Sequence, residues 1–195
     1  TVPVFRTEFR AFLTAFVNNV AAHYQARFSS QGIECALRVA QRDQMGVETY
    51  ATMARSRGMN SARDDSSKPI PTGQGLADAM MKANRHGVLI IPTIQTAKDD
   101  RVWLGSDNGK LPDVQCLMVA PVNGYSAGQK ALLGLLYVTS DRPGDVRLCP
   151  ATTVALKGFA DLMGLLLTIL SPKITQVMQP AAVSPSAGAT QGSQP

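Results

Sequence analysis

Two long helical segments lie near opposite ends of the chain, and they limit what can fold between them. Residues 4–28 carry apolar side chains at spacings of three and four, the pattern of an amphipathic helix. Residues 151–170 form a second long and very apolar segment, and Pro172 predicts where that helix ends. Each helix needs a surface against which it can bury its apolar side. The stripe on the first helix consists of Phe5, Phe9, Phe12, Phe16 and Val20.

The segments between these helices have the composition and pattern of strands. Residues 32–40 alternate apolar and polar side chains, as a half-buried strand does. Further short runs are rich in apolar or β-branched residues and are bounded by turn residues. We expect strands at 32–40, 46–55, 88–94, 114–122 and 130–140. The order of the elements predicts an α+β fold, in which a central antiparallel β-sheet carries the N- and C-terminal helices on one face.

Polar segments separate the expected elements. Residues 56–73 and 98–113 predict two long loops, and residues 75–87 predict a short helix that ends at Gly87. From about residue 177 the chain has no charge and several Pro, Gly and Ser residues, which predicts disorder. We therefore expect three parts: an N-terminal helix over 1–30 that belongs to the domain, a domain core over 31–172, and a disordered tail over 173–195.

The composition favours one cytoplasmic domain. The 195 residues suffice for a single core, and the net charge of +5 is scattered, so no nucleic acid is expected as a partner. The three cysteines, Cys35, Cys116 and Cys149, cannot all pair within the chain, which favours a reducing compartment. The chain has no run of about 18 or more apolar residues, so the sequence predicts no membrane span. We expect a cytoplasmic protein, either alone or as the cytosolic part of a membrane-anchored protein.

Five residues that begin at Gly124 match the G-x-S-x-G pattern of serine hydrolases, with Ser126 in the nucleophile position. That pattern requires a turn from a strand into a helix, whereas here it lies between two expected strands. Asn123 and Gly124 predict a hairpin turn instead. Both histidines, His23 and His86, precede the serine, and a hydrolase of that class has its histidine after it. We therefore expect a hairpin loop and no esterase activity.

Neither a phosphate loop nor a metal site is predicted. The stretch from Gly105 to Leu111 has its glycines too close together, and Lys110 is not followed by Ser or Thr. The histidines and cysteines are too scattered for metal-ligand spacing. We expect no metal and no cofactor.

The stretch from Gly73 to Leu170 resembles a GAF domain. Four pieces carry the resemblance: TGQGLADAMMKANRHGVLIIPTIQ, LPDVQCLMVAPV, KALLGLLYVTSDRPG and ATTVALKGFADLMGLLLTIL. The first is similar to the family's helix and following strand, the next two to its central strands, and the last to its closing helix. Gly134 within the third piece predicts close approach of another element to that strand. The motifs are mostly apolar patterns with small residues at turns.

The resemblance implies a GAF/PAS-like fold in which loops and a short helix cover the sheet face opposite the terminal helices and enclose a small-molecule pocket. The chain has no Asn-Lys and no Asp-Glu dipeptide, both part of the signature of cyclic-nucleotide-binding members. It also has no Cys-His pair for a bilin, and its cysteine spacing differs from that of members that reduce methionine sulfoxide. The pocket would lie beneath 56–73 and 98–113. Its candidate ligand-binding residues are Arg38, Arg101, Trp103 and Gln115, and they favour an anionic or polar ligand.

The leading hypothesis is a non-catalytic regulatory domain that senses a small molecule and transmits a signal through its terminal helices. Phe9, Phe12 and Phe16 are the candidate residues for a homodimer or for contact with a partner protein. An alternative is an interaction or assembly scaffold whose ligand pocket is empty. An enzyme is expected only if Cys116 or Cys149 is exposed and has a lowered pKa, because thiolate is the reactive form of cysteine.

Overall fold

The computed structural model describes residues 2–42, 45–57, 69–71, 73, 75, 87–99, 114–126, 128–147 and 149–178. Its helices are α1 (Val2–Phe28), α3 (Ile94–Asp99) and α4 (Pro150–Met178). Its strands are β1 (Ile33–Arg42), β2 (Glu48–Arg55), β3 (Ile70–Pro71), β4 (Leu89–Ile91), β5 (Cys116–Ser126) and β6 (Gln129–Ser140). The described part therefore has the α+β content that the sequence predicts.

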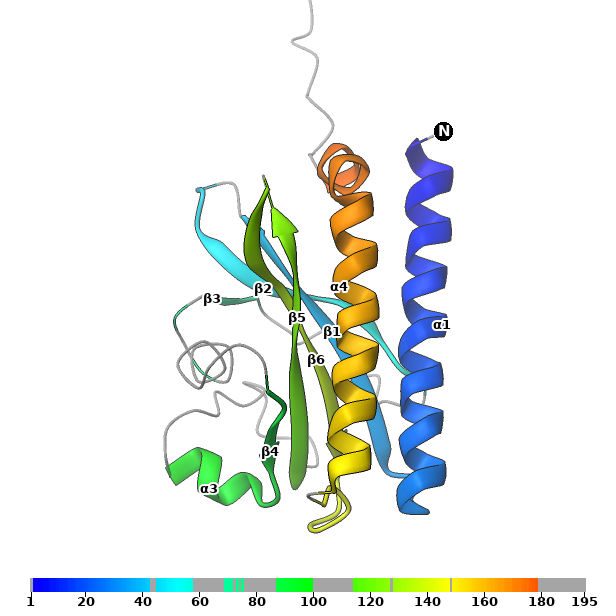
Figure 1. Cartoon of the computed structure of the whole chain (residues 1–195), viewed down its shortest axis with the longest axis vertical. Helices are drawn as coiled ribbons and strands as arrows, with labels where there is room; N and C mark the ends of the chain where they lie inside the picture. Colours follow the sequence, from blue (N-terminus) through cyan, green and yellow to red (C-terminus); the bar gives the residue numbers. More distant parts are fainter. Residues whose placement is uncertain are drawn as a thin grey trace, which may run out of the picture.

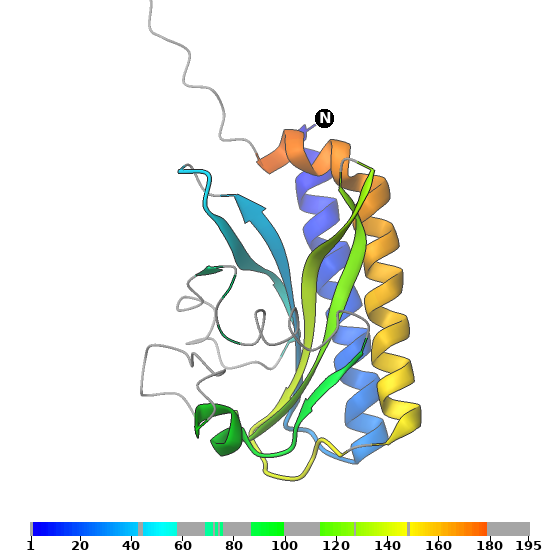
Figure 2. The same ribbon diagram turned by 60° about the vertical axis from the view of Figure 1, so that its left-hand side comes forward.

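The strands form one six-stranded sheet in the order β3-β2-β1-β6-β5-β4. Every neighbouring pair in it is antiparallel. The two central strands, β1 and β6, come from opposite halves of the chain, so the sheet joins the N-terminal hairpin to the C-terminal one. Both α1 and α4 lie on the same face of this sheet (Figures 1 and 2). This arrangement confirms the predicted fold class.

The two long helices run side by side in opposite directions (Figure 1). The hydroxyl of Tyr24 in α1 donates a hydrogen bond of 2.6 Å to the backbone oxygen of Thr152 in α4. Further along, the rings of Phe16 and Phe159 meet edge to face, with centroids 6.2 Å apart. These contacts fix how far α1 and α4 overlap.

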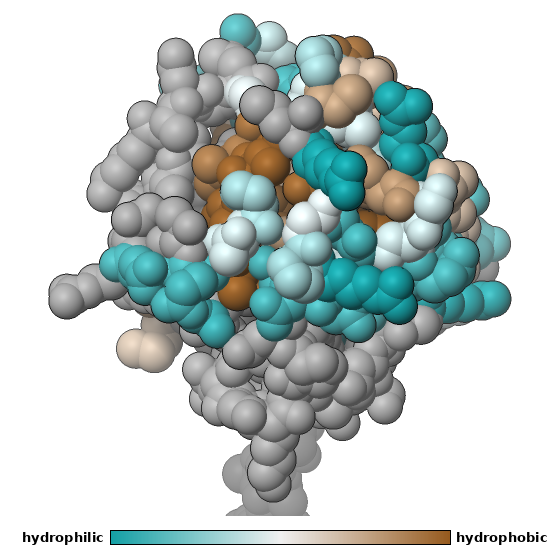
Figure 3. Space-filling view, turned by 90° about the horizontal axis from the view of Figure 1, so that it is seen from below, coloured by the Kyte–Doolittle hydropathy of each residue, from teal (hydrophilic) through white to brown (hydrophobic). Residues whose placement is uncertain are grey.

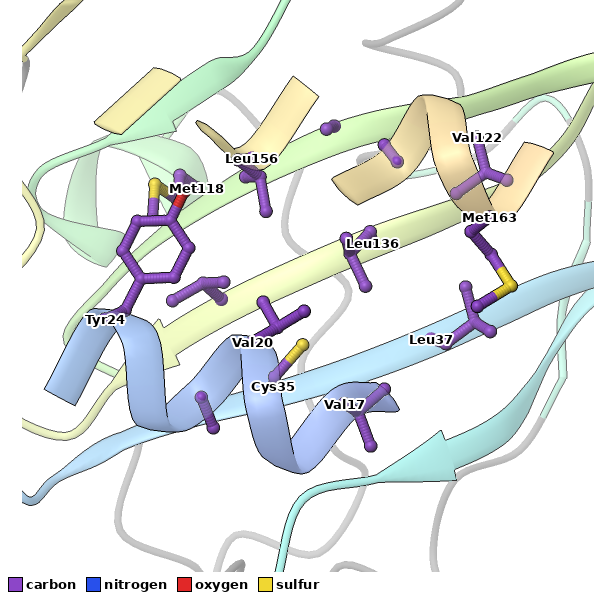
Figure 4. Close-up of a cluster of buried hydrophobic side chains, with 14 of the residues drawn as sticks. Val17, Val20, Tyr24, Cys35, Leu37, Met118, Val122, Leu136, Leu156 and Met163 are labelled. Carbon is purple, nitrogen blue, oxygen red and sulfur yellow. The ribbon is translucent and has the colours of Figure 1, made fainter. Parts of the chain in front are cut away.

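The main core lies between the two helices and the sheet, on what we call the proximal face. Figure 4 shows side chains of α1 and α4 that point toward strands β1, β5 and β6. Every labelled side chain there is 0–1% exposed, which accounts for most of the hydrophobic stabilisation of the fold. Those side chains are Val17, Val20, Tyr24, Cys35, Leu37, Met118, Val122, Leu136, Leu156 and Met163.

Glycines allow unusually close packing at three places in this layer. A Cβ on Gly134 would collide with the backbone of β1 at Arg38 and Val39, which confirms the close approach expected for this strand glycine. A Cβ on Gly164 in α4 would collide with the backbone of Asn123 in β5, and a Cβ on Gly124 would collide with Thr168, Leu133 and the Gly164 oxygen. The absence of these side chains lets α4 lie directly on β5.

The structure corrects three details of the sequence analysis. The strand expected over 88–94 ends at Ile91, and helix α3 begins at Ile94, whose backbone N–H donates to the oxygen of Gln115. The hairpin between β5 and β6 turns after Ser126 and not at Asn123-Gly124, because both strands continue to the pair Ser126 and Gln129. Gly128 supplies the positive φ that this turn needs, at 78°.

The third correction concerns the end of α4. The helix passes Pro172 and continues to Met178, six residues into the segment predicted to be disordered. Its last part turns away from the direction of the rest (Figure 2), as expected when a proline interrupts the hydrogen bonds of a helix. The predicted helix over 75–87 and most of the loops over 56–73 and 98–113 lie outside the described residues.

Candidate functional site

The sheet face turned away from α1 and α4, which we call the distal face, is the place where the GAF resemblance puts a ligand. Strand alternation supplies its side chains: those of β1, β2, β5 and β6 that do not face the helices face this side. A second buried cluster lies here, separate from the main core. It consists of Tyr50, Ile91, Ile94, Ala97, Val114, Leu117, Val119, Leu135 and Tyr137.

Arg38 is a cation on this face. It lies in the middle of β1, where it is paired with Thr52 of β2 on one side and with Leu135 of β6 on the other. A register shift in β1 between Leu37 and Arg38 aligns the arginine with Thr52. Its guanidinium carbon lies 5.9 Å from the centre of the Tyr137 ring, which is a cation–π distance.

The polar atoms around Arg38 are not all satisfied. Within the described part of the chain, Nη1 of Arg38 and Oγ1 of Thr52 are buried and have no hydrogen-bond partner. A buried donor on a charged group costs free energy unless something accepts from it. Because the neighbouring side chains here are apolar or hydroxyl-bearing, an anionic or strongly polar group would complete this arrangement.

Tyr137 is held in its neutral form. Burial raises its pKa to about 12, a shift that the nearby Tyr50 hydroxyl increases and the Arg38 charge opposes. The phenol can therefore donate a hydrogen bond at physiological pH, and Arg38 provides the positive charge. An arginine, a tyrosine and a threonine on adjacent strands can bind an anion.

The structure separates two of the predicted ligand-binding residues. Gln115 lies just before β5, where its backbone N–H donates to Ser140 and its oxygen accepts from Ile94. Arg38 pairs with Leu135 of β6, and Leu135 pairs with Pro121 of β5. Pro121 lies six residues beyond Gln115. At about 3.3 Å per residue this is roughly 20 Å, so one small ligand cannot contact both. Arg101 and Trp103 lie outside the described residues.

The three phenylalanines predicted for partner contact differ in exposure. Phe9 and Phe16 are partly buried and pack against the main core. Phe12 is 47% exposed and is the one of the three that solvent reaches freely. The sequence could not separate them because the apolar stripe of α1 is wider than the area that the sheet covers.

The three cysteines lie in different environments. Cys35 is fully buried, and burial raises its pKa. Cys116 is also buried, and its raised pKa has the same cause. Cys149 precedes the first residue of α4; backbone N–H groups of Ala151 and Thr152 lower its pKa, with a smaller contribution from Arg27. Of the two cysteines on which an enzyme was expected to depend, Cys149 is therefore the partly exposed one with a lowered pKa.

Cys149 lies at the end of the molecule where α1 ends and α4 begins. Figure 3 views this end, where hydrophilic side chains surround a smaller hydrophobic area. Nη2 of Arg27 lies 3.8 Å from the Cys149 sulfur. Among the described residues no group of three or more His, Cys, Asp or Glu side chains could hold a metal ion.

The segment that resembled a nucleophile elbow has no strand-to-helix turn. Ser126 ends β5 and pairs with Gln129 across the hairpin. His23 packs edge to face against Tyr24 and Phe159, with centroids 4.9 and 5.5 Å away, so it is an aromatic contact between the two long helices. His86 lies outside the described residues.

Sequence reasoning selected Arg38 but missed the residues around it. Thr52 and Tyr137 lie 14 and 99 positions further along the chain, and only the strand register brings them to Arg38. The available indication was that an arginine in the middle of an apolar, alternating strand needs a partner on its own face of the sheet.

No family model and no curated protein matches the chain at the sequence level. Solved structures do match. The GAF domain of a phosphoenolpyruvate-protein phosphotransferase from Acinetobacter is 12% identical with a TM-score of 0.56, over 80% of this chain and 82% of that one. The corresponding GAF domain from Coxiella burnetii is 15% identical with a TM-score of 0.54, over 91% and 95%.

A third match is the GAF domain of PixJ from Thermosynechococcus elongatus, in its blue-light absorbing form. It is 15% identical with a TM-score of 0.52, over 89% of this chain and 93% of that one. At such identities the similarity concerns the fold alone. The antiparallel sheet, the two helices on its proximal face and these matches together show that the chain has a GAF-like fold.

Proposed function

We propose that this chain is a non-catalytic regulatory domain that binds a small anionic ligand on its distal face and transmits the bound state to α1 and α4. The fold is one that occurs in sensory and regulatory proteins. The observation that carries the proposal is the buried Nη1 of Arg38, which has no acceptor among the described residues. An anion would supply that acceptor.

The neighbouring groups indicate what kind of anion fits. A guanidinium offers two parallel N–H donors, which suit a planar carboxylate or nitrate or an oxygen pair of a phosphate. Thr52 adds a hydroxyl with an unused oxygen, and the ring face of the neutral Tyr137 lies against the guanidinium that would bind the anion. The apolar side chains of Leu135 and its neighbours favour a compact ligand with one charged end.

Strand β1 offers a path from the ligand to the helices. Arg38 faces the distal side, whereas the adjacent Leu37 faces the proximal side and is fully buried in the cluster that also holds Val17 of α1. A ligand that draws Arg38 outward therefore also acts on the packing beneath α1. The ligand shifts the domain only as far as it binds one of two arrangements more tightly.

The test is thermal unfolding of the full chain with a panel of nitrate, phosphate, small dicarboxylates and nucleoside phosphates. A ligand at about 100 times its Kd adds roughly 2.7 kcal/mol, which corresponds to a rise in Tm of about 5–10 °C for a chain of this size. We expect such a rise with at least one anion, and its loss in Arg38→Met. Calorimetric titration of the same anion then gives the Kd.

Arg42→Met is the matched control, because Arg42 lies on the same strand but is exposed and paired with Glu48 at 3.1 Å. It should keep the full shift in Tm. Arg38→Met without ligand should be about as stable as the wild type, because the loss of the Tyr137 contact is offset by removal of a buried Nη1 that lacks an acceptor. A panel without any shift would instead favour the scaffold alternative, and a shift that Arg38→Met retains would place the ligand elsewhere.

A further inference from the structure

The two central strands, β1 and β6, are paired along only part of their length. Their register begins at the pair Ile33 and Ser140 and ends at the pair Val39 and Gly134. Beyond that pair β1 runs on to Arg42, and in the described chain each strand then pairs only with its hairpin partner, β2 or β5. Figure 2 shows the two hairpins diverging toward the end of the molecule that holds the N-terminus. The sheet thus opens into a fork, whose two arms are residues 40–42 with 45–50 and residues 123–126 with 128–133.

Both hairpins are irregular at the level where the fork begins. The register of β1 with β2 shifts between Leu37 and Arg38, and that of β5 with β6 shifts directly after Val122. Val122 pairs with Gly134, and Gly134 pairs with Val39, so both irregularities lie next to the last pair of the central strands. A bulge bends its strand and increases the local twist. Two bulges at one level therefore direct the two arms apart.

Each hairpin is attached to a helix of its own. Helix α1 packs mainly on β1 and β2, whereas α4 packs mainly on β5 and β6. The backbone N–H of Arg57, just after β2, donates to Oδ1 of Asn18 in α1 at 2.6 Å. In the β5–β6 arm the N–H of Tyr125 donates to Oγ1 of Thr168 in α4 at 3.0 Å. We call the two sets the N-terminal module (α1, β1 and β2) and the C-terminal module (β5, β6 and α4).

Contacts between α1 and α4 hold the two modules together beside the paired part of the sheet. The hydroxyl of Tyr24 binds the backbone of α4 there, and Phe16 meets Phe159, which precedes by more than a turn the Gly164 that lies on β5. Helix α4 is otherwise little covered. The segment from Pro150 to Leu170 is apolar enough by length and composition to cross a membrane, yet only 28% of its most apolar window is buried. The rest of each helix can therefore follow its own hairpin.

Arg38 lies where the fork begins and touches both modules. It belongs to β1, and its carbonyl oxygen is the atom that a Cβ on Gly134 of β6 would strike. Its guanidinium lies 5.9 Å from the ring centre of Tyr137, also in β6, whereas the unsatisfied Thr52 that pairs with it belongs to β2. An anion held by Arg38 and Thr52 would therefore lie at the boundary of the two modules, and its size would set how closely they approach.

The β1–β2 arm contains an unsatisfied polar group of its own. Thr49 is 7% exposed, and its Oγ1 has no hydrogen-bond partner among the described residues. It pairs with Gln41, beyond the point where β1 separates from β6. A buried hydroxyl without a partner costs free energy, and a second position of this arm that satisfies Thr49 would recover that free energy.

We propose that the domain consists of these two modules joined by a hinge at Val39 and Gly134, and that an anion bound at Arg38 selects one angle between them. The part played by the anion rests on the function proposed above, whereas the hinge itself does not. The fork converts binding on the distal face into a change in the angle between α1 and α4, because each helix moves with its own hairpin. A ligand that binds both angles equally well changes nothing.

The first experiment measures distances between pairs of nitroxide spin labels by pulsed electron resonance, without added anion. The labels are attached to introduced cysteines in a Cys149→Ser background, in which the remaining cysteines are buried. The pair that crosses the fork is Glu48→Cys with Lys130→Cys, both at exposed positions. We expect its distance distribution to be broader than that of either pair within one module.

Two pairs within a module serve as matched controls, because each shares one label with the crossing pair. They are Glu48→Cys with Ala15→Cys in the N-terminal module and Lys130→Cys with Ile169→Cys in the C-terminal module, all at exposed positions. Mobility of a hairpin tip broadens a control pair as much as the crossing pair, so excess width in the crossing pair measures the hinge. Equal widths in all three pairs would show a rigid sheet and overturn the proposal.

The second experiment repeats these measurements with nitrate, inorganic phosphate, succinate and AMP. It adds the pair Ala15→Cys with Ile169→Cys, which reports on the two helices. With an anion that raises the Tm, the width of the crossing pair should fall about two-fold, because a ligand that selects one arrangement removes the other. The helix pair should shift its mean distance, while the pairs within a module stay unchanged. Arg38→Met should abolish both effects, and Arg42→Met should keep them.

The outcomes separate this inference from the function proposed above. If no anion raises the Tm, binding at Arg38 is wrong and so is the part of the anion in the hinge, while the widths without anion still decide whether the hinge exists. If an anion raises the Tm through Arg38 but leaves the crossing and helix pairs unchanged, the binding stands and the coupling is overturned. All labelled positions are exposed, so each variant should unfold as cooperatively as the Cys149→Ser background.

Discussion

At the scale of single residues, some buried polar side chains have hydrogen-bond partners and others do not. On the proximal face the buried Tyr24 hydroxyl is satisfied by the Thr152 oxygen, at 2.6 Å. On the distal face Nη1 of Arg38 and Oγ1 of Thr52 lack partners in the described chain, and so does Oγ1 of Thr49, whose side chain alternates to the other face. Such groups are few in folded proteins, and each of them requires an explanation. Arg38 and Thr52 are paired neighbours on the distal face, and this pairing of two unsatisfied groups supports a ligand site there.

Cys149 should be the most reactive thiol of the chain. Backbone N–H groups at the start of α4 and the Arg27 guanidinium lower its pKa, whereas burial raises those of Cys35 and Cys116. Treatment with iodoacetamide at pH 7.5, followed by peptide mass spectrometry, should modify Cys149 first, because the thiolate is the nucleophile. Arg27→Gln should slow its alkylation, while the exposed Arg147→Gln should not. Equal rates at all three cysteines would contradict this expectation.

At the scale of elements, the sequence predicted most strands and both long helices because their alternation or apolar stripe reflects one covered side. Alternation over 32–40 became β1, and the stripe over 4–28 became α1. The sequence analysis misplaced features that depend on tertiary contacts. Helix α3 begins where the Ile94 N–H donates to the Gln115 oxygen, and Gly124 lies within β5 against α4 instead of in the β5–β6 turn.

The sequence predicted one residue of the candidate site but not the residues that surround it. Arg38 stood out as a charge within an apolar strand, but its neighbours depend on a register shift next to Leu37 that no local pattern reveals. Gln115 was grouped with Arg38 by residue type, and the pairing of the strands places it roughly 20 Å away. Spatial grouping of residues from different strands requires the register, which the sequence does not contain locally.

The contact between α4 and β5 depends on Gly164. A Cβ there would overlap the carbonyl oxygen of Asn123, and a backbone atom cannot move aside as a flexible side chain can. Gly164→Ala should therefore lower the free energy of unfolding by about 1–3 kcal/mol despite the better helix propensity of alanine. Chemical denaturation at several protein concentrations measures this.

Gly87→Ala serves as the control for that substitution. Gly87 is exposed, and a Cβ there would meet nothing within 4 Å. Its free energy of unfolding should stay within about 0.5 kcal/mol of the wild type. An unchanged or increased stability of Gly164→Ala would show that α4 does not lie as close to β5 as described.

At the scale of the whole molecule, one sheet separates two clusters of different character. The proximal cluster is large and lies under both long helices, whereas the distal cluster contains two tyrosines, Tyr50 and Tyr137, beside an arginine. Strands β1 and β6 contribute to both clusters, so the two layers share their central strands. Unfolding of either layer exposes the other, and ionisation of a buried group in one layer should therefore affect the stability of the whole chain.

Alkaline pH should destabilise the fold through Tyr137. Its pKa is about 12 in the folded chain against an ordinary value of 10, so its contribution to stability is complete below pH 10 and is lost as the pH rises toward 12. The full shift of two pH units corresponds to about 3 kcal/mol. Urea denaturation between pH 8 and 11 should show a falling free energy of unfolding, and Tyr137→Phe should flatten that decline. Tyr125→Phe, at a half-exposed site, should follow the wild type. If Tyr137→Phe declines as steeply as the wild type, the distal phenol is not buried in solution, and the ligand site inferred beside it loses its enclosing wall.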